Sequence, residues 1–278
     1  MLNFKILKKH KIGLSLITGL SLKEFEGLIK KVNPEWQRLI QKKEAVGRPH
    51  GLKSLEDKVL AMLIYYRIYV TQRFIGVLMN VDNSTICRGI KRIEKLVIKV
   101  IKIKKVRTLS QAELENILVD CTEQPVERPT KRQKRYYSGK KKMHTIKTEL
   151  VVTKSEGKPV KIISISKAHL GKTHDYKVRK CGAPFHPKAK IYGDSAYIGL
   201  KKTNPEAKIP IKKTKKNNLN SSQKAYNMSI SKVRIFVEHA IGKIKRFKIM
   251  SDRYRNKRVG HNLKFNLIAG IVNFKSGY

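Results

Sequence analysis

Three carboxylates of this sequence are candidates for a catalytic role. Asp120 and Asp194 each close a short apolar run typical of a buried strand, and Glu238 is the only acidic residue between positions 207 and 251. Three carboxylates without a His or Cys cluster favour a hard cation, Mg²⁺ or Mn²⁺, over zinc. A pair of such ions about 3.5–4 Å apart is typical of phosphoryl transfer. Each aspartate taken alone is also typical of a turn after a strand.

The segment 231–250 that carries Glu238 has a helical period. Its apolar residues recur at steps of four and three and form one stripe: Val233, Val237, Ala240, Ile244 and Phe247. At about 100° per residue, Arg234, Glu238 and Lys245 fall within roughly 40° of each other beside this stripe. We expect Glu238 where a buried face meets a cleft. The alternative is an exposed Arg–Glu pair, which is worth only a few tenths of a kcal/mol.

Helical patterns fill the first part of the chain. Three helices are predicted near residues 54–70, 71–79 and 84–103, with a tight turn at residues 80–83 between the last two. A helix after such a turn is typical of a helix-turn-helix, whose second helix places its N-terminal side chains against base edges. The candidate DNA contacts on it are Thr85, Arg88, Lys91 and Arg92. A plain helical bundle with a solvated basic face is the alternative.

Strand patterns take over after residue 109. The predicted strands are 116–120, 143–154, 160–166, 190–194 and 208–211, with two antiparallel connections and a short helix near 175–180. Capping boxes are expected at Ser21 with Glu24 and at Ser110 with Glu113, the first before a short amphipathic helix. Polar segments at 41–53 and 104–109 are predicted linkers.

The charge of the chain indicates its partner. Lys and Arg number 63 and Asp and Glu 20, so the formal charge is 63 − 20 = +43. Nucleic acid is the common polyanion that would neutralise it. A basic RNA-associated protein is one alternative, and the helix-turn-helix pattern argues against it. An anionic membrane surface is the other, and we find no run of 18 apolar residues that would span a bilayer.

Three sequence motifs resemble those of a known family. LVDCTEQPVERP, IYGDSAY and RIFVEHAIGKIK resemble the acidic motifs of DDE transposases, and more narrowly those of the bacterial insertion-sequence families numbered four and five. There the last motif is Tyr, two residues, Arg, three residues, Glu, six residues, Lys. Arg234, Glu238 and Lys245 keep this spacing, whereas Ser231 stands at the Tyr position. The resemblance runs from about Ser54 to the end of the chain.

The resemblance implies an α/β (α+β) chain with a helix-turn-helix domain at 51–107 and a ribonuclease H-like mixed-sheet catalytic domain at 108–278, after an N-terminal segment at 1–50. Asp120, Asp194 and Glu238 would be the catalytic residues and the ligands of two Mg²⁺ ions, with Mn²⁺ able to substitute. The residues implied to contact DNA phosphates are Arg234, Lys245, Lys140 and Lys142, the last two in the segment YYSGKKK. His174-Asp175 matches a further family feature, and we expect it to start a helix.

The function implied is that of a transposase. It would bind the ends of an insertion sequence, cleave a DNA strand in a metal-dependent reaction and transfer the freed end to target DNA. We expect a homodimer on double-stranded DNA, in the bacterial cytoplasm and associated with the nucleoid. The alternative is a non-catalytic helix-turn-helix regulator derived from an inactive transposase.

Overall fold

The chain folds into two compact units. The computed structural model describes residues 1–278 apart from 42–50, 53, 104–108 and 214–217. Unit 1 comprises residues 1–102, 245–252 and 263–275, and unit 2 comprises residues 103–244, 253–262 and 276–278. This grouping differs from the three consecutive segments expected, because the N-terminal helices and a C-terminal segment share a unit with the helix-turn-helix region. The predicted linkers lie mostly outside the described residues.

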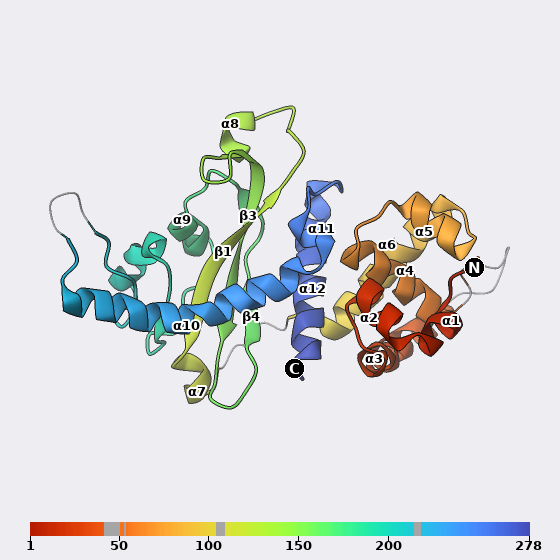
Figure 1. The fold of residues 1–278 in the computed structure, drawn as a ribbon, viewed down its shortest axis with the longest axis horizontal. Coiled ribbons are helices and arrows are strands. Elements are labelled where there is room, and N and C mark those ends of the chain that lie inside the picture. Colours follow the sequence, from red (N-terminus) through yellow and green to blue (C-terminus); the bar gives the residue numbers. More distant parts are fainter. Residues whose placement is uncertain (42–50, 53, 104–108, 214–217) are drawn as a thin grey trace. The chain divides into compact units, whose positions relative to one another are not determined.

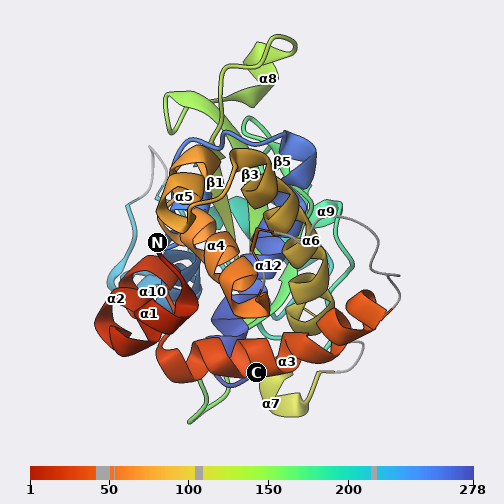
Figure 2. The same cartoon turned by 90° about the vertical axis from the view of Figure 1, so that its right-hand side faces the viewer.

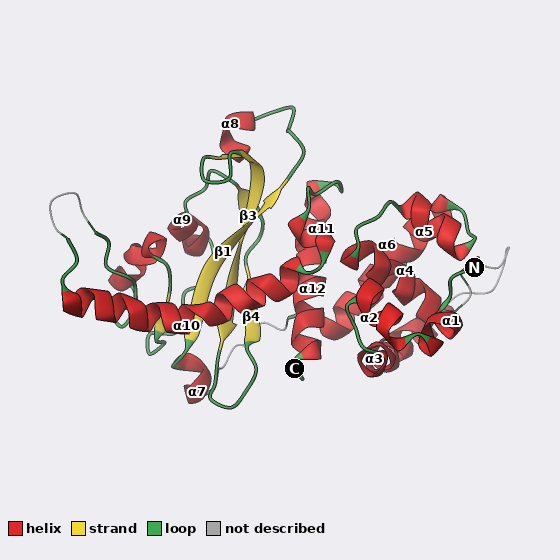
Figure 3. Cartoon of the chain, in the orientation of Figure 1, coloured by secondary structure: helices red, strands yellow, loops and turns green. Residues whose placement is uncertain are grey.

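All the regular elements among the described residues of unit 1 are helices (Figures 2 and 3). Its helices are α1 (Phe4–Lys9), α2 (Lys11–Thr18), α3 (Leu22–Gln41), α4 (Leu55–Arg67), α5 (Gln72–Met79), α6 (Asn83–Ile101), α11 (Lys248–Ser251) and, from residue 263 on, α12 (His261–Lys275). The capping box of Ser21 and Glu24 is confirmed, since each backbone N–H bonds to the other side chain. The helix that it opens, α3, has 20 residues rather than the short span predicted.

The predicted helix-turn-helix is made by α5, a tight turn and α6. Asn80 adopts the left-handed conformation, with φ 52°, that ends α5. Asp82 then caps α6, because its side chain accepts a hydrogen bond from the Ser84 N–H. A Cβ atom on Gly76 would lie 2.6 Å from the carbonyl oxygen of Val81, so glycine is what allows the turn to close against α5.

An apolar stripe of α6 is buried. Ile86, Ile90, Ile93 and Val97 are buried, and α6 packs against α3, α4 and α5. Glu94 is buried beside this stripe, where its carboxylate accepts a 2.7 Å hydrogen bond from Tyr66 and lies 3.2 Å from the ammonium of Lys264. The polar side chains on the outer face of α6 are therefore left for solvent or a ligand.

Unit 2 contains the six strands of the described chain (Figure 1). They are β1 (Ile117–Pro125), β2 (Tyr137–Ser138), β3 (Met143–Thr153), β4 (Lys161–Ile165), β5 (His169–Leu170) and β6 (Ile191–Tyr192). The main path runs β2-β3-β1-β6, and β4 and β5 also pair with β3. The pairs β1–β3 and β3–β4 are antiparallel and β1–β6 is parallel, so the predicted mixed sheet is confirmed.

Helices complete unit 2. They are α7 (Gln111–Leu114), α8 (Gln133–Tyr136), α9 (Asp175–Lys180), the 3₁₀ helices η1 (Ser195–Lys202) and η2 (Arg258–Gly260), and the long α10 (Ser221–Lys245), which crosses the strands in Figure 1. The capping box of Ser110 and Glu113 and the short helix at 175–180 are confirmed. Residues of η1 and the strands form a buried core that includes Val119, Val151, Ile191 and Tyr197.

Three further predicted elements were wrong in extent. The strand expected at 116–120 continues as β1 to Pro125, so Asp120 does not end it. The strand expected at 208–211 is only a single bridge between Lys208 and Tyr192. The helix expected over 231–250 instead runs from Ser221, after Asn220 accepts a hydrogen bond from the Gln223 N–H, and stops at Lys245. Phe247 leaves the helix for an extended conformation and is buried, while the carbonyl of Arg246 accepts a 2.7 Å hydrogen bond from Arg67.

None of the helices among the described residues combines the length and the apolar character that crossing a bilayer requires.

Candidate active site and DNA-binding surface

Asp120 lies in the middle of β1, on the face of the sheet that meets α10. Its neighbours Val119 and Cys121 pack on the core that contains η1, and side chains alternate along a strand, so Asp120 points the other way. One carboxylate oxygen accepts a 2.7 Å hydrogen bond from the Cys121 N–H. The other lies 4.0 Å from the guanidinium of Arg234 on α10. With 20% of its side chain exposed, Asp120 is a largely buried acid.

Asp194 follows the strand parallel to β1. The register pairs Leu118 with Tyr192, and Asp120 and Asp194 each come two residues later. β6 ends at Tyr192 while β1 continues beside it, and functional groups of α/β folds gather at such carboxyl ends of parallel strands. The side chain of Asp194 caps η1 by accepting a hydrogen bond from the Ser195 N–H.

Glu238 reaches the same region from α10. Its carboxylate lies 4.0 Å from Arg234, the same guanidinium that faces Asp120. The side chain of Glu238 is 57% exposed and that of Arg234 only 16%. The predicted pair at i,i+4 is therefore present, and the cation in it lies between two of the three candidate acids. Lys245 is the last residue of the same helix.

The pKa of Asp120 depends on its burial and on the charges around it, including that of Asp194. Burial raises the pKa of Asp120 to about 6, and the negative charges of Asp194 and Asp175 push it the same way. Arg234 and the Cys121 N–H oppose this rise. Asp194 follows Tyr192 by two residues as Asp120 follows its partner Leu118, and this register is what places the two carboxylates near each other. A buried carboxylate with a raised pKa is a common feature of functional sites.

The donor set fits a hard divalent cation. Asp120, Asp194 and Glu238 supply only oxygen ligands, which Mg²⁺ prefers. Among the residues described, no three acidic, His or Cys side chains are arranged to hold a metal ion as they stand. Arg234 instead places a positive charge between Asp120 and Glu238. The space between Asp120 and Glu238 therefore already holds a positive charge, that of Arg234.

A layer of buried ion pairs supports the opposite face of β1. Arg179 lies 2.7 Å from Glu149, both almost fully buried, and Lys147 lies 2.7 Å from Asp175. Burial raises the pKa of Glu149 to about 7, although Arg179 opposes this. Reasoning from the sequence missed the pair of Glu149 and Arg179, because no spacing in the chain connects residues on β3 and α9. Asp175 begins α9 as expected, and His174 caps that helix.

The candidate DNA-binding residues of α6 differ in exposure. Arg88 and Lys91 are exposed, and Thr85 is half-buried. The guanidinium of Arg88 donates a 2.9 Å hydrogen bond to Ser84, which holds it near the start of the helix. Arg92 is half-buried and lies near Lys58, whose pKa is lowered to about 8 by burial first and by the charge of Arg92 second. Arg88 and Lys91 are thus the more accessible.

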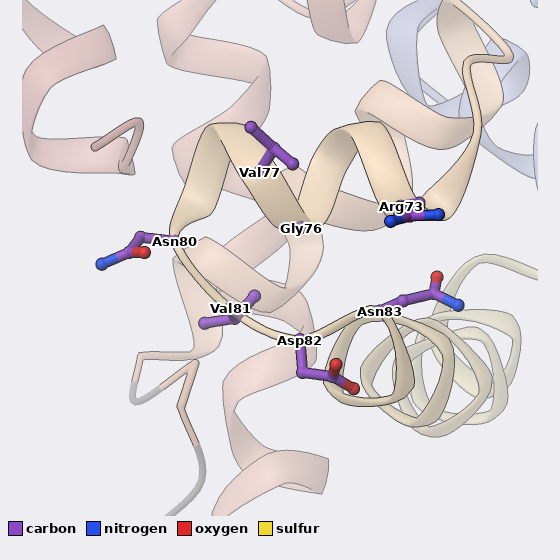
Figure 4. A pocket seen from close by; sticks show the side chains of 7 residues that line it. All are labelled: Arg73, Gly76, Val77, Asn80, Val81, Asp82 and Asn83. Carbon is purple, nitrogen blue, oxygen red and sulfur yellow. The ribbon is translucent and has the colours of Figure 1, made fainter.

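A pocket of about 460 Å³ opens beside the turn of the helix-turn-helix (Figure 4). Its lining residues are Arg73, Gly76, Val77, Asn80, Val81, Asp82 and Asn83. The exposed Arg73 on α5 was not among the candidates, although its place at the start of the helix before the turn is a signal that could have found it.

The lysine-rich segment forms a hairpin loop. Residues 139–142 connect β2 to β3, and Ser138 accepts a hydrogen bond from the backbone N–H of Lys141. Lys140 and Lys142 are exposed, and Lys142 takes a left-handed conformation with φ 54°. The loop therefore offers two ammonium groups to a polyanion.

Comparisons with known proteins match both units. Residues 119–273 match the family described as DDE superfamily endonuclease, and residues 50–103 match the one described as helix-turn-helix of DDE superfamily endonuclease. The chain is also similar to a protein of Microchaete diplosiphon named as a probable transposase for insertion sequence element IS702. The two are 35% identical over 264 residues, which cover 93% of this chain and 92% of that protein. The resemblance expected from the motifs is confirmed.

Proposed function

Since the chain belongs to the DDE superfamily of endonucleases, as an insertion-sequence transposase with its helix-turn-helix, we propose that Asp120, Asp194 and Glu238 form its catalytic site. Enzymes of this superfamily depend on divalent metal ions. We propose that the three carboxylates hold two Mg²⁺ ions, for which Mn²⁺ can substitute. The observation that carries the proposal is that the guanidinium of Arg234 lies 4.0 Å from both Asp120 and Glu238. In addition, the negative charge of Asp194 raises the pKa of Asp120.

The reaction would be cleavage of a phosphodiester at the end of the element, followed by attack of the freed 3′-hydroxyl on target DNA. When bound, a pair of metal ions supplies Lewis acidity at the attacking and leaving oxygens. The part of the protein is to fix the donors. Asp120 is held by the Cys121 N–H and Asp194 by the Ser195 N–H, so both carboxylates are oriented before DNA arrives. Their partial burial limits competing water.

Cations around the site would hold the DNA backbone. Arg234 presents a fork of donors that matches a phosphate, and Lys245 adds positive charge at the end of the same helix. Lys140 and Lys142 would contact phosphates farther along the duplex from their hairpin loop. These contacts position the DNA and carry no sequence information.

Sequence would be recognised by α6. Thr85, Arg88 and Lys91 lie along its N-terminal half, where a recognition helix meets base edges, and Arg92 would support them from its half-buried position. Joining two ends of one element requires two active sites, so we propose a homodimer on DNA. Such a protein would act on the bacterial nucleoid in the cytoplasm.

The direct test is a nicking assay with the full chain and a labelled duplex that carries the terminal inverted repeat of the element. We expect a nick at the end of the element that leaves a 3′-hydroxyl, in Mg²⁺ and in Mn²⁺, and no nick when EDTA is present. Nicking that persists in EDTA would contradict the proposed metal site, and specific binding without any nicking would favour a non-catalytic regulator.

Base recognition by α6 gives a separate prediction. Arg88→Ala should lower the preference for the element's end over random duplex by about 1–3 kcal/mol, because Arg is well suited to guanine edges in the major groove. Lys140→Ala should instead weaken binding to both duplexes equally and reduce the log–log salt slope by about 0.9. Fluorescence anisotropy at several salt concentrations measures both. An Arg88→Ala protein with unchanged preference would show that this side chain does not contact bases.

A further inference from the structure

Arg234 occupies an unusual place for a residue expected to bind DNA. Its guanidinium lies 4.0 Å from a carboxylate oxygen of Asp120 and 4.0 Å from one of Glu238. Its side chain is only 16% exposed. In the protein without DNA, this positive charge therefore sits between two of the acids proposed to hold metal.

The hydrogen bonding of Arg234 is incomplete in this position. Both carboxylate distances exceed the usual hydrogen-bond range, so the attraction is mainly one of charge. The Nε–H of Arg234 is buried and has no hydrogen-bond partner within the described part of the chain. A buried donor without an acceptor is unfavourable. A phosphate group, whose oxygens can accept two parallel hydrogen bonds from one guanidinium, would give this Nε–H an acceptor.

Arg234 and a metal ion would compete for the same oxygens. A guanidinium keeps its charge at every physiological pH, so it can leave the carboxylates only by moving. A divalent ion on Asp120 and Glu238 would bring further positive charge against it. Asp194 and Asp175 add negative charge near Asp120, which strengthens the hold on whichever cation is present.

We propose that Arg234 is an internal counter-ion that keeps the metal site closed until a DNA phosphate draws its guanidinium away from Asp120 and Glu238. The proposal rests on the proposed function and adds that metal loading depends on DNA. Because coupling between two ligands is reciprocal, metal must then raise DNA affinity by the same factor as DNA raises metal affinity. The site would stay without metal, and without nuclease activity, away from its substrate.

The test measures Mn²⁺ binding to the full chain by the loss of the paramagnetic resonance signal of free Mn²⁺, with and without an element-end duplex. Wild-type protein should bind Mn²⁺ about tenfold more tightly when the duplex is present, a typical coupling between sites. Arg234→Met removes the charge and keeps an apolar stem. It should bind Mn²⁺ that tightly without DNA and gain little from the duplex. Arg135→Met, which removes an exposed arginine of α8, should behave as wild type.

Asp120→Asn separates the failure of this proposal from failure of the proposed function, and it also reports Mn²⁺ held by the duplex itself. If Asp120→Asn binds Mn²⁺ with DNA as tightly as wild type does, the metal site itself is wrong. If Asp120→Asn loses Mn²⁺ but wild type binds equally well with and without DNA, only the role of Arg234 is overturned. That wild-type comparison stands even if melting shows that Arg234→Met does not fold. A folded Arg234→Met that binds no more tightly than wild type without DNA also overturns it.

Discussion

Asp120→Asn should reduce metal-dependent nicking by about a thousandfold or more and at the same time raise the melting temperature at pH 7. The loss follows because Asn cannot supply the charged oxygens that hold a divalent ion, and the Lewis-acid contribution is worth several kcal/mol at about 1.4 kcal/mol per tenfold in rate. Asn keeps the size of the side chain, and its carbonyl oxygen can still accept the hydrogen bond from the Cys121 N–H. The fold should therefore persist.

The gain in stability follows from the buried charge of Asp120. Its pKa of about 6 in the folded protein exceeds the ordinary value of about 3.9 expected in the unfolded chain. The stabilisation from its neutral form is therefore complete below about pH 4 and lost as the pH rises through about 6. At pH 7 the ionised carboxylate destabilises the metal-free protein by up to about 3 kcal/mol, a value that already includes the opposing attraction of Arg234.

Thermal melting of both proteins between pH 4 and pH 8 in EDTA measures this effect. The advantage of Asp120→Asn should be absent near pH 4 and should grow until about pH 7. A variant that is less stable than wild type at pH 7 would show that the pairing with Arg234 outweighs the burial of Asp120.

Glu238→Gln should also slow nicking by about two to three orders of magnitude, but the stability of the fold should not change. Its side chain is 57% exposed, and substitutions at such positions usually change stability by less than about 0.5 kcal/mol. Gln has a similar helix propensity, so α10 is kept. Binding to the element's end should be unchanged, because α6 belongs to the other unit.

The measurement compares nicking, end binding and melting for wild type, Glu238→Gln and Glu156→Gln. Glu156 is an exposed acid in a turn of the same unit, so its variant controls for the loss of one negative charge. Nicking by Glu238→Gln at nearly the wild-type rate would identify Glu238 as a surface ion pair with Arg234. The metal site would then have only Asp120 and Asp194 as carboxylate ligands.

Local rules predicted the elements that position the site. Strand patterns correctly located β1 and β6, and a helical period located α10 around Glu238. The strand ends were less accurate, because β1 continues past Asp120 to Pro125 and Asp194 follows β6 as the cap of η1. The turn before α6 followed from the tolerance of Asn80 for a left-handed backbone. These features depend on residues close together in the chain, which is why the sequence alone could indicate them.

What depends on distant contacts could not be predicted. The early end of α10 follows from Phe247 being buried and from the hydrogen bond of Arg67 to the Arg246 carbonyl, residues almost 180 positions apart. The pairing of Arg234 with Asp120 likewise joins a helix to a strand more than 100 residues earlier. The sequence showed only the i,i+4 neighbour of Arg234, and so the shared cation between two acids was not foreseen.

The most direct test of the central claim is nicking by Asp194→Asn, since Asp120 and Glu238 are linked through Arg234 whereas Asp194 is placed beside Asp120 by the strand register. Asn is also a good helix cap, so η1 and the fold should be kept while the charge is lost. The control is Glu206→Gln, an exposed acid that follows η1. We predict that Asp194→Asn melts like wild type, binds the element's end, and nicks it at least a hundredfold more slowly in Mg²⁺, while Glu206→Gln nicks normally. A folded Asp194→Asn that nicks at the wild-type rate would contradict a site made of Asp120, Asp194 and Glu238.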